Sequence, residues 1–216
     1  DTVEGVGQEV SAIVATLRAH PPGTVTLCPI GPLTNIATAL QQAPDVVPRI
    51  REIVLMGGAV FEGGNSTPSA EFNILVDPHA ADVVFRCGVP ITVMPLDVSH
   101  KALTTRARVD RIRALGTPVA TAVAKMLEFF ERYDEQKYGT DGAPLHDPCV
   151  ISFLLQPGLF KGRKVNVAIE TASPLTLGMT VTDWWKVTDR APNATVMTEV
   201  DADAYYELLT GRLARL

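Results

Sequence analysis

The 216 residues are 46% apolar and 20% charged, a composition typical of a globular protein with a core and not of a disordered chain. At about 150 residues per domain, this length predicts a single domain over residues 1–216. Nineteen Lys and Arg against 24 Asp and Glu give a net charge of −5. This balance argues against a nucleic-acid partner, because binding to a phosphate backbone depends on clustered cations.

The cysteines and the chain start indicate the compartment. Cys28, Cys87 and Cys149 lie far apart without a C-x-x-C pair, which favours reduced thiols over disulfides or a cysteine zinc site. No stretch approaches the roughly 20 consecutive apolar residues of a membrane span, and residues 1–5 do not resemble a signal peptide. We therefore expect a cytoplasmic protein without a membrane partner. A start at Asp1, without an initiator Met, leaves open a processed, tagged or truncated product.

Helical and extended patterns alternate along the chain. Apolar residues at three- and four-residue spacing predict a first helix over Val6–Leu17. The further predicted helices are Leu33–Gln41, Pro78–Cys87, Thr117–Lys137, Asp147–Leu155 and Asp201–Leu213, and the predicted strands are Thr24–Cys28, Glu52–Met56, Ile91–Leu96, Val165–Ile169 and Thr195–Thr198. This alternation predicts an α/β fold with an open, mostly parallel (Rossmann-like) sheet and helices on both faces, whose ligands bind at the carboxyl ends of the strands.

A polar loop over residues 61–73 follows the predicted strand Glu52–Met56. It contains the amides Asn65 and Asn73 and the carboxylate Glu71. Amides donate and accept hydrogen bonds and a carboxylate accepts strongly, so this set suits a ligand rich in vicinal hydroxyls, such as a sugar. The alternative is a surface loop whose side chains cap nearby turns, and the loop alone favours that interpretation.

Two further segments admit two interpretations each. In His146-Asp147-Pro148, Asp147 stands where it would cap a helix, but His146 is also suited to act as an acid and Asp147 to bind Ca²⁺ or Mg²⁺. Gly31-Pro32 after Ile30 is typical of a strand-to-helix turn with Pro at the helix start. The backbone carbonyl of Ile30 could alternatively bind a cation.

Five motifs together resemble, in order and spacing, those of the inosine-uridine preferring nucleoside hydrolases: Gly31-Pro32-Leu33-Thr34-Asn35, Met56-Gly57-Gly58, Ala70-Glu71-Phe72-Asn73, Asp77-Pro78-His79-Ala80-Ala81 and His146-Asp147-Pro148. The resemblance extends from Thr24 to about Phe160. It implies a Ca²⁺-dependent enzyme that splits the N-glycosidic bond of ribonucleosides into ribose and free base. It also implies a homodimer or homotetramer.

The resemblance assigns roles by position. Asn65, Glu71 and Asn73 match the family's ligands of the ribose hydroxyls. Asp147 matches its late calcium ligand, and Ile30 the residue whose carbonyl binds the metal. His146 matches the proposed acid that assists departure of the base. These roles fit the reaction, since groups that hold the ribose and stabilise its developing positive charge lower the barrier.

Aromatic residues outside the motifs have several possible roles. Tyr133 and Tyr138 could stack over the base, or they could mark an exposed helix end. Trp184 and Trp185 could be a packing pair, an interface anchor or part of the base site, and core or interface use is favoured. The sequence leaves the preference for purine or pyrimidine bases open.

One family feature has no match. The family's first strand precedes an aspartate cluster of the form D-x-D-P-G-x-D-D, which supplies the main calcium ligands, whereas Asp1 and Asp45 stand in helical or turn contexts. We therefore expect a nucleoside hydrolase fold without its first strand. For this chain alone we expect little or no hydrolase activity and weak calcium binding. The alternatives are a non-catalytic nucleoside- or ribose-binding relative and polar loops that serve only packing.

Overall fold

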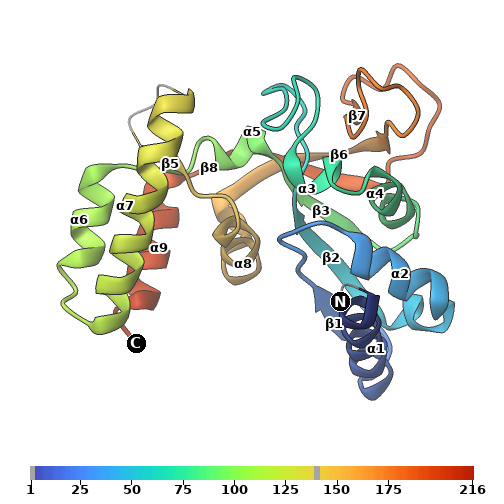
Figure 1. Ribbon diagram of the computed structural model, residues 1–216, viewed down its shortest axis with the longest axis horizontal. Coiled ribbons are helices and arrows are strands. Elements are labelled where there is room, and N and C mark those ends of the chain that lie inside the picture. Colours follow the sequence, from blue (N-terminus) through green and yellow to red (C-terminus); the bar gives the residue numbers. More distant parts are fainter. Residues whose placement is uncertain (1–2, 139–141) are drawn as a thin grey trace. The chain divides into compact units, whose positions relative to one another are not determined.

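The computed structural model describes residues 3–138 and 142–216 (Figure 1). Contacts divide the chain into two compact units. Unit 1 comprises Asp1–Leu96 and Gly162–Met197, and unit 2 comprises Asp97–Lys161 and Thr198–Leu216. A division into compact units does not decide the number of domains, so the single domain over residues 1–216 stays a prediction. In the described parts of the chain, no helix combines the length and apolar character needed to cross a membrane.

The main sheet has six strands in the order β1-β2-β3-β8-β6-β7. The pairs β1–β2, β2–β3 and β3–β8 are parallel, whereas β6–β7 is antiparallel. The predicted α/β fold with a mostly parallel sheet is therefore confirmed. The bounds of the strands are β1 Val25–Leu27, β2 Ile50–Met56, β3 Ile91–Met94, β6 Phe160–Ile169, β7 Thr180–Asp183 and β8 Ala194–Val200.

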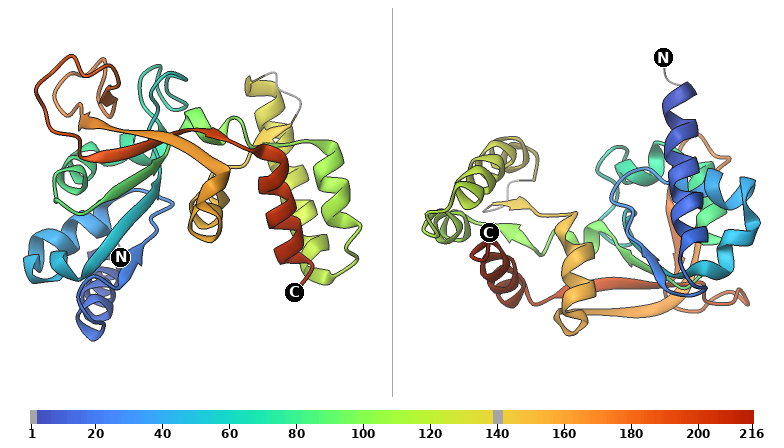
Figure 2. Two further views of the ribbon diagram at one scale, coloured as in Figure 1. Left: turned by 180° about the vertical axis from the view of Figure 1, so that it is seen from behind. Right: turned by 90° about the horizontal axis from the view of Figure 1, so that it is seen from below.

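The helices of unit 1 bury the central strands. Helix α1 packs on α2, and α2 packs on α4 (Figure 2). Their apolar faces and the sheet form one core cluster, in which Ile53 and Leu55 of β2 are fully buried. This burial explains why the second half of β2, residues 53–56, is a continuous apolar run and not an alternating one. The helices are α1 Val3–Ala19, α2 Thr34–Gln42, the 3₁₀ helix η1 Pro44–Arg49, α3 Phe72–Leu75 and α4 Pro78–Phe85.

Unit 2 is largely helical. Helices α6, α7 and α9 lie side by side (Figure 2) and share a second apolar cluster that includes Val109, Ile112, Ala124, Leu127 and Leu213. Strands β4 and β5 form a short antiparallel pair. The elements here are α5 Leu96–Ser99, β4 Leu103–Thr104, α6 Arg106–Arg113, α7 Pro118–Tyr138, β5 Ala143–Pro144, α8 Pro148–Leu155, the 3₁₀ helix η2 Pro157–Leu159 and α9 Ala202–Leu213.

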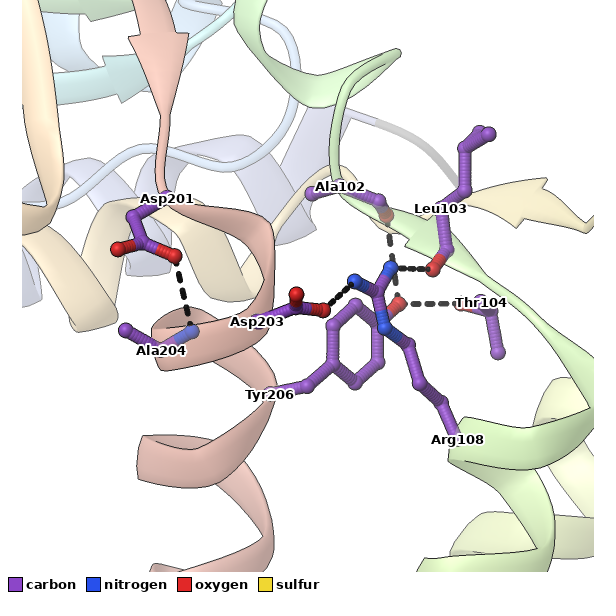
Figure 3. Close-up of polar contacts among 8 residues, drawn as sticks. All are labelled: Ala102, Leu103, Thr104, Arg108, Asp201, Asp203, Ala204 and Tyr206. Atoms are coloured by element: carbon purple, nitrogen blue, oxygen red, sulfur yellow. Dashed lines mark hydrogen bonds and ion pairs between the residues drawn. The ribbon is translucent and has the colours of Figure 1, made fainter.

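A buried tyrosine joins three elements of unit 2 (Figure 3). The hydroxyl of Tyr206 lies 2.7 Å from Thr104 Oγ1 and donates to the carbonyl of Ala102 at 3.3 Å. The guanidinium of Arg108 lies 4.4 Å from the centre of the Tyr206 ring and donates to Asp203 at 2.6 Å. Helices α6 and α9 are thus tied to β4, which pairs with the strand just before His146.

Most long elements agree with the sequence prediction to within a few residues, but two strands differ. Strand β6 begins at Phe160, five residues before the predicted start at Val165. The predicted strand Ile91–Leu96 ends at Met94, and Leu96 already belongs to α5. Pro95 has no amide hydrogen for a strand ladder, which explains the early end. The elements that the sequence did not predict are α3, α5, α6, β4, β5, β7, η1 and η2.

Candidate functional site

A tight turn follows β2 at the carboxyl end of the sheet. The backbone of Gly58 has φ +80°, a conformation that favours glycine. Its N–H donates to Glu71 Oε2 at 2.9 Å, and its carbonyl accepts from the Leu96 N–H at 2.9 Å. The Met56-Gly57-Gly58 motif therefore serves to bring the backbone against the Glu71 carboxylate.

The carboxylate of Glu71 is buried and accepts three backbone hydrogen bonds. Besides Gly58, it accepts from the N–H of Asn73 at 2.9 Å and of Ile74 at 3.3 Å, and the residue is only 2% exposed. Glu71 thus caps α3, as the alternative interpretation of the loop requires. A carboxylate has about four acceptor positions, so this role is compatible with a further hydroxyl donor.

The two amides of the loop lie close to Glu71 in the chain and in space. Asn73 is buried, and its Nδ2 donates to the carbonyl of Met56 at 3.1 Å. Asn65 accepts from the N–H of Phe72 through Oδ1 at 2.9 Å. The three predicted ribose ligands are therefore brought together around α3. Asn65 and Glu71 also hold the backbone of the loop, and Asn73 holds the end of β2.

Ile30 lies in the segment that joins β1 to α2. The N–H of Met56 donates to the carbonyl of Pro29 at 3.1 Å, so backbone pairing with β2 reaches the residue before Ile30. The Ile30 residue is 50% exposed. A few residues further on, Thr34 Oγ1 donates to Asp77 Oδ2 at 2.7 Å. Two of the five motifs are thus linked to each other, and Asp77 also caps α4 through Ala80.

His146 and Asp147 belong to unit 2 and precede α8. His146 Nδ1 lies 2.7 Å from the hydroxyl of Ser99, a fully buried residue. Asp147 occupies the N-cap position of α8 but makes no side-chain cap hydrogen bond. The capping interpretation of Asp147 is therefore wrong. Partial burial raises the pKa of the Asp147 carboxyl, because it penalises the charged form.

A cavity of about 190 Å³ lies beside this pair. His146, Asp147 and Thr104 supply its polar wall. The remaining wall is apolar and consists of Leu127, Phe130, Ala143, Pro144, Leu145 and Pro148. A mostly apolar lining with a few polar groups is typical of small-molecule sites.

Comparisons with known proteins identify the family. Residues 4–207 match the model of the family described as inosine-uridine preferring nucleoside hydrolase. The chain belongs to this family. It is 52% identical over 213 residues to an uncharacterized protein of Schizosaccharomyces pombe. This alignment covers 99% of this chain and 69% of that protein. It is 51% identical over 191 residues to the pyrimidine-specific ribonucleoside hydrolase RihA of Shewanella sp. strain ANA-3, over 88% of this chain and 60% of that enzyme.

Solved structures agree with this assignment. The purine-preferring ribonucleoside hydrolase from Gardnerella vaginalis superposes with a TM-score of 0.86 at 32% identity, over 95% of this chain and 65% of that one. The plant nucleoside hydrolase PpNRh1 gives a TM-score of 0.87 at 27% identity, over 96% of this chain and 67% of that one. The chain thus spans about 60 to 69% of the length of these relatives.

The calcium ion that the nucleoside hydrolase family implies does not fit the described residues. Ca²⁺ requires about six to eight oxygen ligands. Among the side chains that the structure describes, those of residues 7–130 and 142–216, no group of three or more His, Cys, Asp or Glu could hold a metal ion. The predicted ligands Ile30 and Asp147 lie in different units. Their roles as metal ligands stay predictions, and we derive no chemical step through calcium.

The aromatic residues outside the motifs divide into two groups. The side chains of Tyr133 and Tyr138 lie outside the described residues, so their predicted stacking is not tested. Trp184 packs partly buried against the core of unit 1, with its ring edge-on to Phe61 at 5.3 Å. Trp185 is 74% exposed. The pair therefore splits into a packing residue and a surface residue.

Two residues near the candidate site were missed by sequence reasoning. Ser99 contacts His146, and Thr180 bonds to the backbone of Ala59 in the turn after β2. Both contacts join segments far apart in the chain, and β7, which contains Thr180, is a short strand that the sequence did not predict. No local signal in either segment could have identified them.

Proposed function

We propose that the protein hydrolyses the N-glycosidic bond of ribonucleosides to ribose and free base. The observation that supports this most strongly is the grouping of Asn65, Glu71 and Asn73 around α3, in a chain that matches the nucleoside hydrolase family over residues 4–207. In unit 2, the carboxyl of Asp147 stands at the start of α8 without a cap bond, beside His146, a residue type suited to acid catalysis.

The proposed substrates are pyrimidine ribonucleosides. Relatives that are 46 to 51% identical to this chain are pyrimidine-specific ribonucleoside hydrolases from Shewanella and Salmonella. The purine-preferring enzyme of Gardnerella vaginalis is only 32% identical. The higher identity to the pyrimidine-specific enzymes supports uridine and cytidine over inosine.

The proposed chemistry uses the two groups of residues in different ways. Glu71, Asn65 and Asn73 bind the ribose hydroxyls, and the Glu71 carboxylate stabilises the positive charge that develops on the sugar. His146 protonates the departing base. With Nδ1 held by Ser99 at 2.7 Å, the proton would leave from Nε2.

The cellular setting is also proposed. Cys28, Cys87 and Cys149 are free thiols, which supports a reducing compartment such as the cytoplasm. Burial raises the pKa of the Cys149 thiol to about 12, so this group is not suited to act as a nucleophile. We propose a homodimer or homotetramer, as the family resemblance implies.

The test is release of ribose from uridine, cytidine and inosine with Ca²⁺ added, by the protein expressed from its complete reading frame. We expect uridine and cytidine to react at least about tenfold faster than inosine. His146→Gln should lower kcat by about 10²- to 10⁴-fold. The matched control His20→Gln changes an exposed residue just after α1, whose ring contacts the carbonyl of Thr16, and should leave kcat unchanged.

The 216-residue polypeptide alone should reach no more than about 1% of that rate, because its described residues do not fit a calcium site with about six to eight oxygen ligands. Robust turnover by a mass-verified 216-residue chain would contradict this expectation. Absence of ribose release by the complete protein would overturn the hydrolase. Binding of ribose in EDTA, measured by calorimetry without hydrolysis, would then favour a ribose-binding relative.

A further inference from the structure

The hydroxyl of Thr180 binds both backbone groups of Ala59. Oγ1 accepts from the Ala59 N–H at 2.9 Å and donates to the Ala59 carbonyl at 2.5 Å. Thr180 is the first residue of β7 and is 5% exposed, and Ala59 is also buried. One side chain thus satisfies a donor and an acceptor of a residue 121 positions away, which would otherwise be buried without partners.

The same side chain also fits closely against Gly58. A Cβ atom at Gly58 would lie 2.7 Å from Thr180 Cγ2 and 3.1 Å from its Oγ1. The methyl group of Thr180 therefore occupies the space that glycine leaves. Since the hydroxyl is held by Ala59, the side chain cannot rotate away without losing both hydrogen bonds.

The turn that Thr180 fixes is the one that binds Glu71. Gly58 precedes Ala59 directly, and its N–H donates to Glu71 Oε2 at 2.9 Å. Through its other oxygen Glu71 accepts from the N–H of Asn73, whose side chain returns to the carbonyl of Met56. A short and continuous set of contacts therefore links Thr180 to two of the predicted ribose ligands.

The segment between β6 and β7 contacts the polar loop and α3 at a second place. A Cβ at Gly178, where φ is +79°, would lie 3.0 Å from the Cα of Leu75 and 3.3 Å from the Cβ of Ala70. Ser69 Oγ donates to the carbonyl of Leu175 at 3.3 Å. The β6–β7 segment thus contacts α3 through Gly178 and the turn after β2 through Thr180.

We propose that Thr180 is a positioning residue for ribose binding: its hydroxyl fixes Ala59 and thereby orients the Gly58 N–H that holds the Glu71 carboxylate. The proposal rests on the proposed ribose site at Glu71 and Asn73. Thr180 itself acts through the turn and through Glu71. A threonine at this position is suited to the role because one hydroxyl can both donate and accept.

The experiment compares three variants of the 216-residue chain. Thr180→Val keeps the shape and removes the hydroxyl, whereas Thr180→Ser keeps the hydroxyl. Thr182→Val is the matched control, because the Thr182 hydroxyl makes only a 3.4 Å contact within β7. The probes are binding of D-ribose by calorimetry and the amide hydrogen exchange of Gly58 and Ala59 by NMR.

We expect Thr180→Val to weaken ribose binding at least about tenfold and to speed exchange of the Gly58 and Ala59 amides at least about tenfold relative to β2. Thr180→Ser and Thr182→Val should stay within about threefold of the parent in both measurements. If Thr180 served only to stabilise unit 1, Thr180→Val would lower the stability of the unit without locally faster exchange of the Gly58 and Ala59 amides. Thr180→Ser would then not specifically restore ribose binding.

Three results would overturn the proposal. The first is a folded Thr180→Val variant that keeps its ribose affinity, and the second is one that keeps slow Gly58 exchange. The third result applies if Thr180→Val does not fold. In that case, a folded Thr180→Ser variant that loses ribose affinity about tenfold would overturn the proposal. If the parent chain does not bind ribose, the proposed ribose site fails. Unchanged Gly58 exchange in Thr180→Val would then also reject the positioning role. Locally faster exchange would support the part of the proposal in which Thr180 orients Glu71, without the ribose site.

Discussion

Gly58 and Gly88 form a matched pair that separates steric overlap from backbone strain. Both have positive φ, +80° and +82°, but a Cβ at Gly58 would lie 2.7 Å from Thr180 Cγ2, whereas nothing lies within 4 Å at Gly88. An alanine in this region of φ costs roughly 1–2 kcal/mol in the free energy of unfolding. The 2.7 Å contact is about 0.8 Å shorter than an optimal carbon–carbon contact of about 3.5 Å, and overpacking adds about 1–3 kcal/mol.

We therefore expect Gly88→Ala to destabilise the protein by about 1–2 kcal/mol and Gly58→Ala by about 2–5 kcal/mol. Urea unfolding followed by circular dichroism measures both values, provided that the slope with denaturant stays unchanged. Equal losses for the two variants, within about 0.5 kcal/mol, would refute the reasoning. Such a result would mean that Thr180 yields easily and does not fix the turn.

Three further variants test unit 2. Tyr206→Phe removes a buried hydroxyl that contacts Thr104 and Ala102 (Figure 3) and should cost about 1–3 kcal/mol of unfolding free energy. Tyr205→Phe removes a buried hydroxyl that has no hydrogen-bond partner among the described residues, so it should cost less. Equal costs in urea unfolding would contradict this. Asp147→Asn should raise the urea midpoint at about pH 7, because partial burial raises the pKa of folded Asp147 and its ionisation therefore destabilises the fold as the pH rises. The gain should disappear at about pH 3, where the carboxyl is protonated in both states, and a loss of stability at pH 7 would argue against it.

Elements with a strong period could be predicted from the sequence, and short ones could not. Helix α1 has apolar residues at helical spacing, and residues 53–56 of β2 form a buried apolar run, so local patterns suffice for both. Helix α6 has a highly charged sequence in which only Val109 and Ile112 are buried. Strands β4 and β5 have two residues each, too few for any period to show, and they exist because they pair with each other.

The candidate site shows the same contrast between residues that local patterns identify and contacts that only the fold creates. The motifs located Glu71, Asn73 and His146, because each motif is a run of neighbouring residues with unusual chemistry. The contacts of these residues come from distant segments: Ser99 lies 47 positions from His146, and Thr180 lies 121 positions from Ala59. A serine in a four-residue helix and a threonine at the start of a four-residue strand have no distinguishing pattern of their own. Only the folded chain identifies them.

Glu71 and Asp147 show why residue type alone did not decide between a structural and a functional role. Both stand at the start of a helix, where a carboxylate is expected to cap it. Glu71 does so, with three backbone N–H groups on its oxygens, whereas Asp147 makes no cap bond and is partly desolvated. A carboxylate held by N–H groups is fixed in place, which suits it to stabilise positive charge on a sugar. Capping at Glu71 is therefore compatible with its proposed role, since the bonds that stabilise α3 also preorganise the charge.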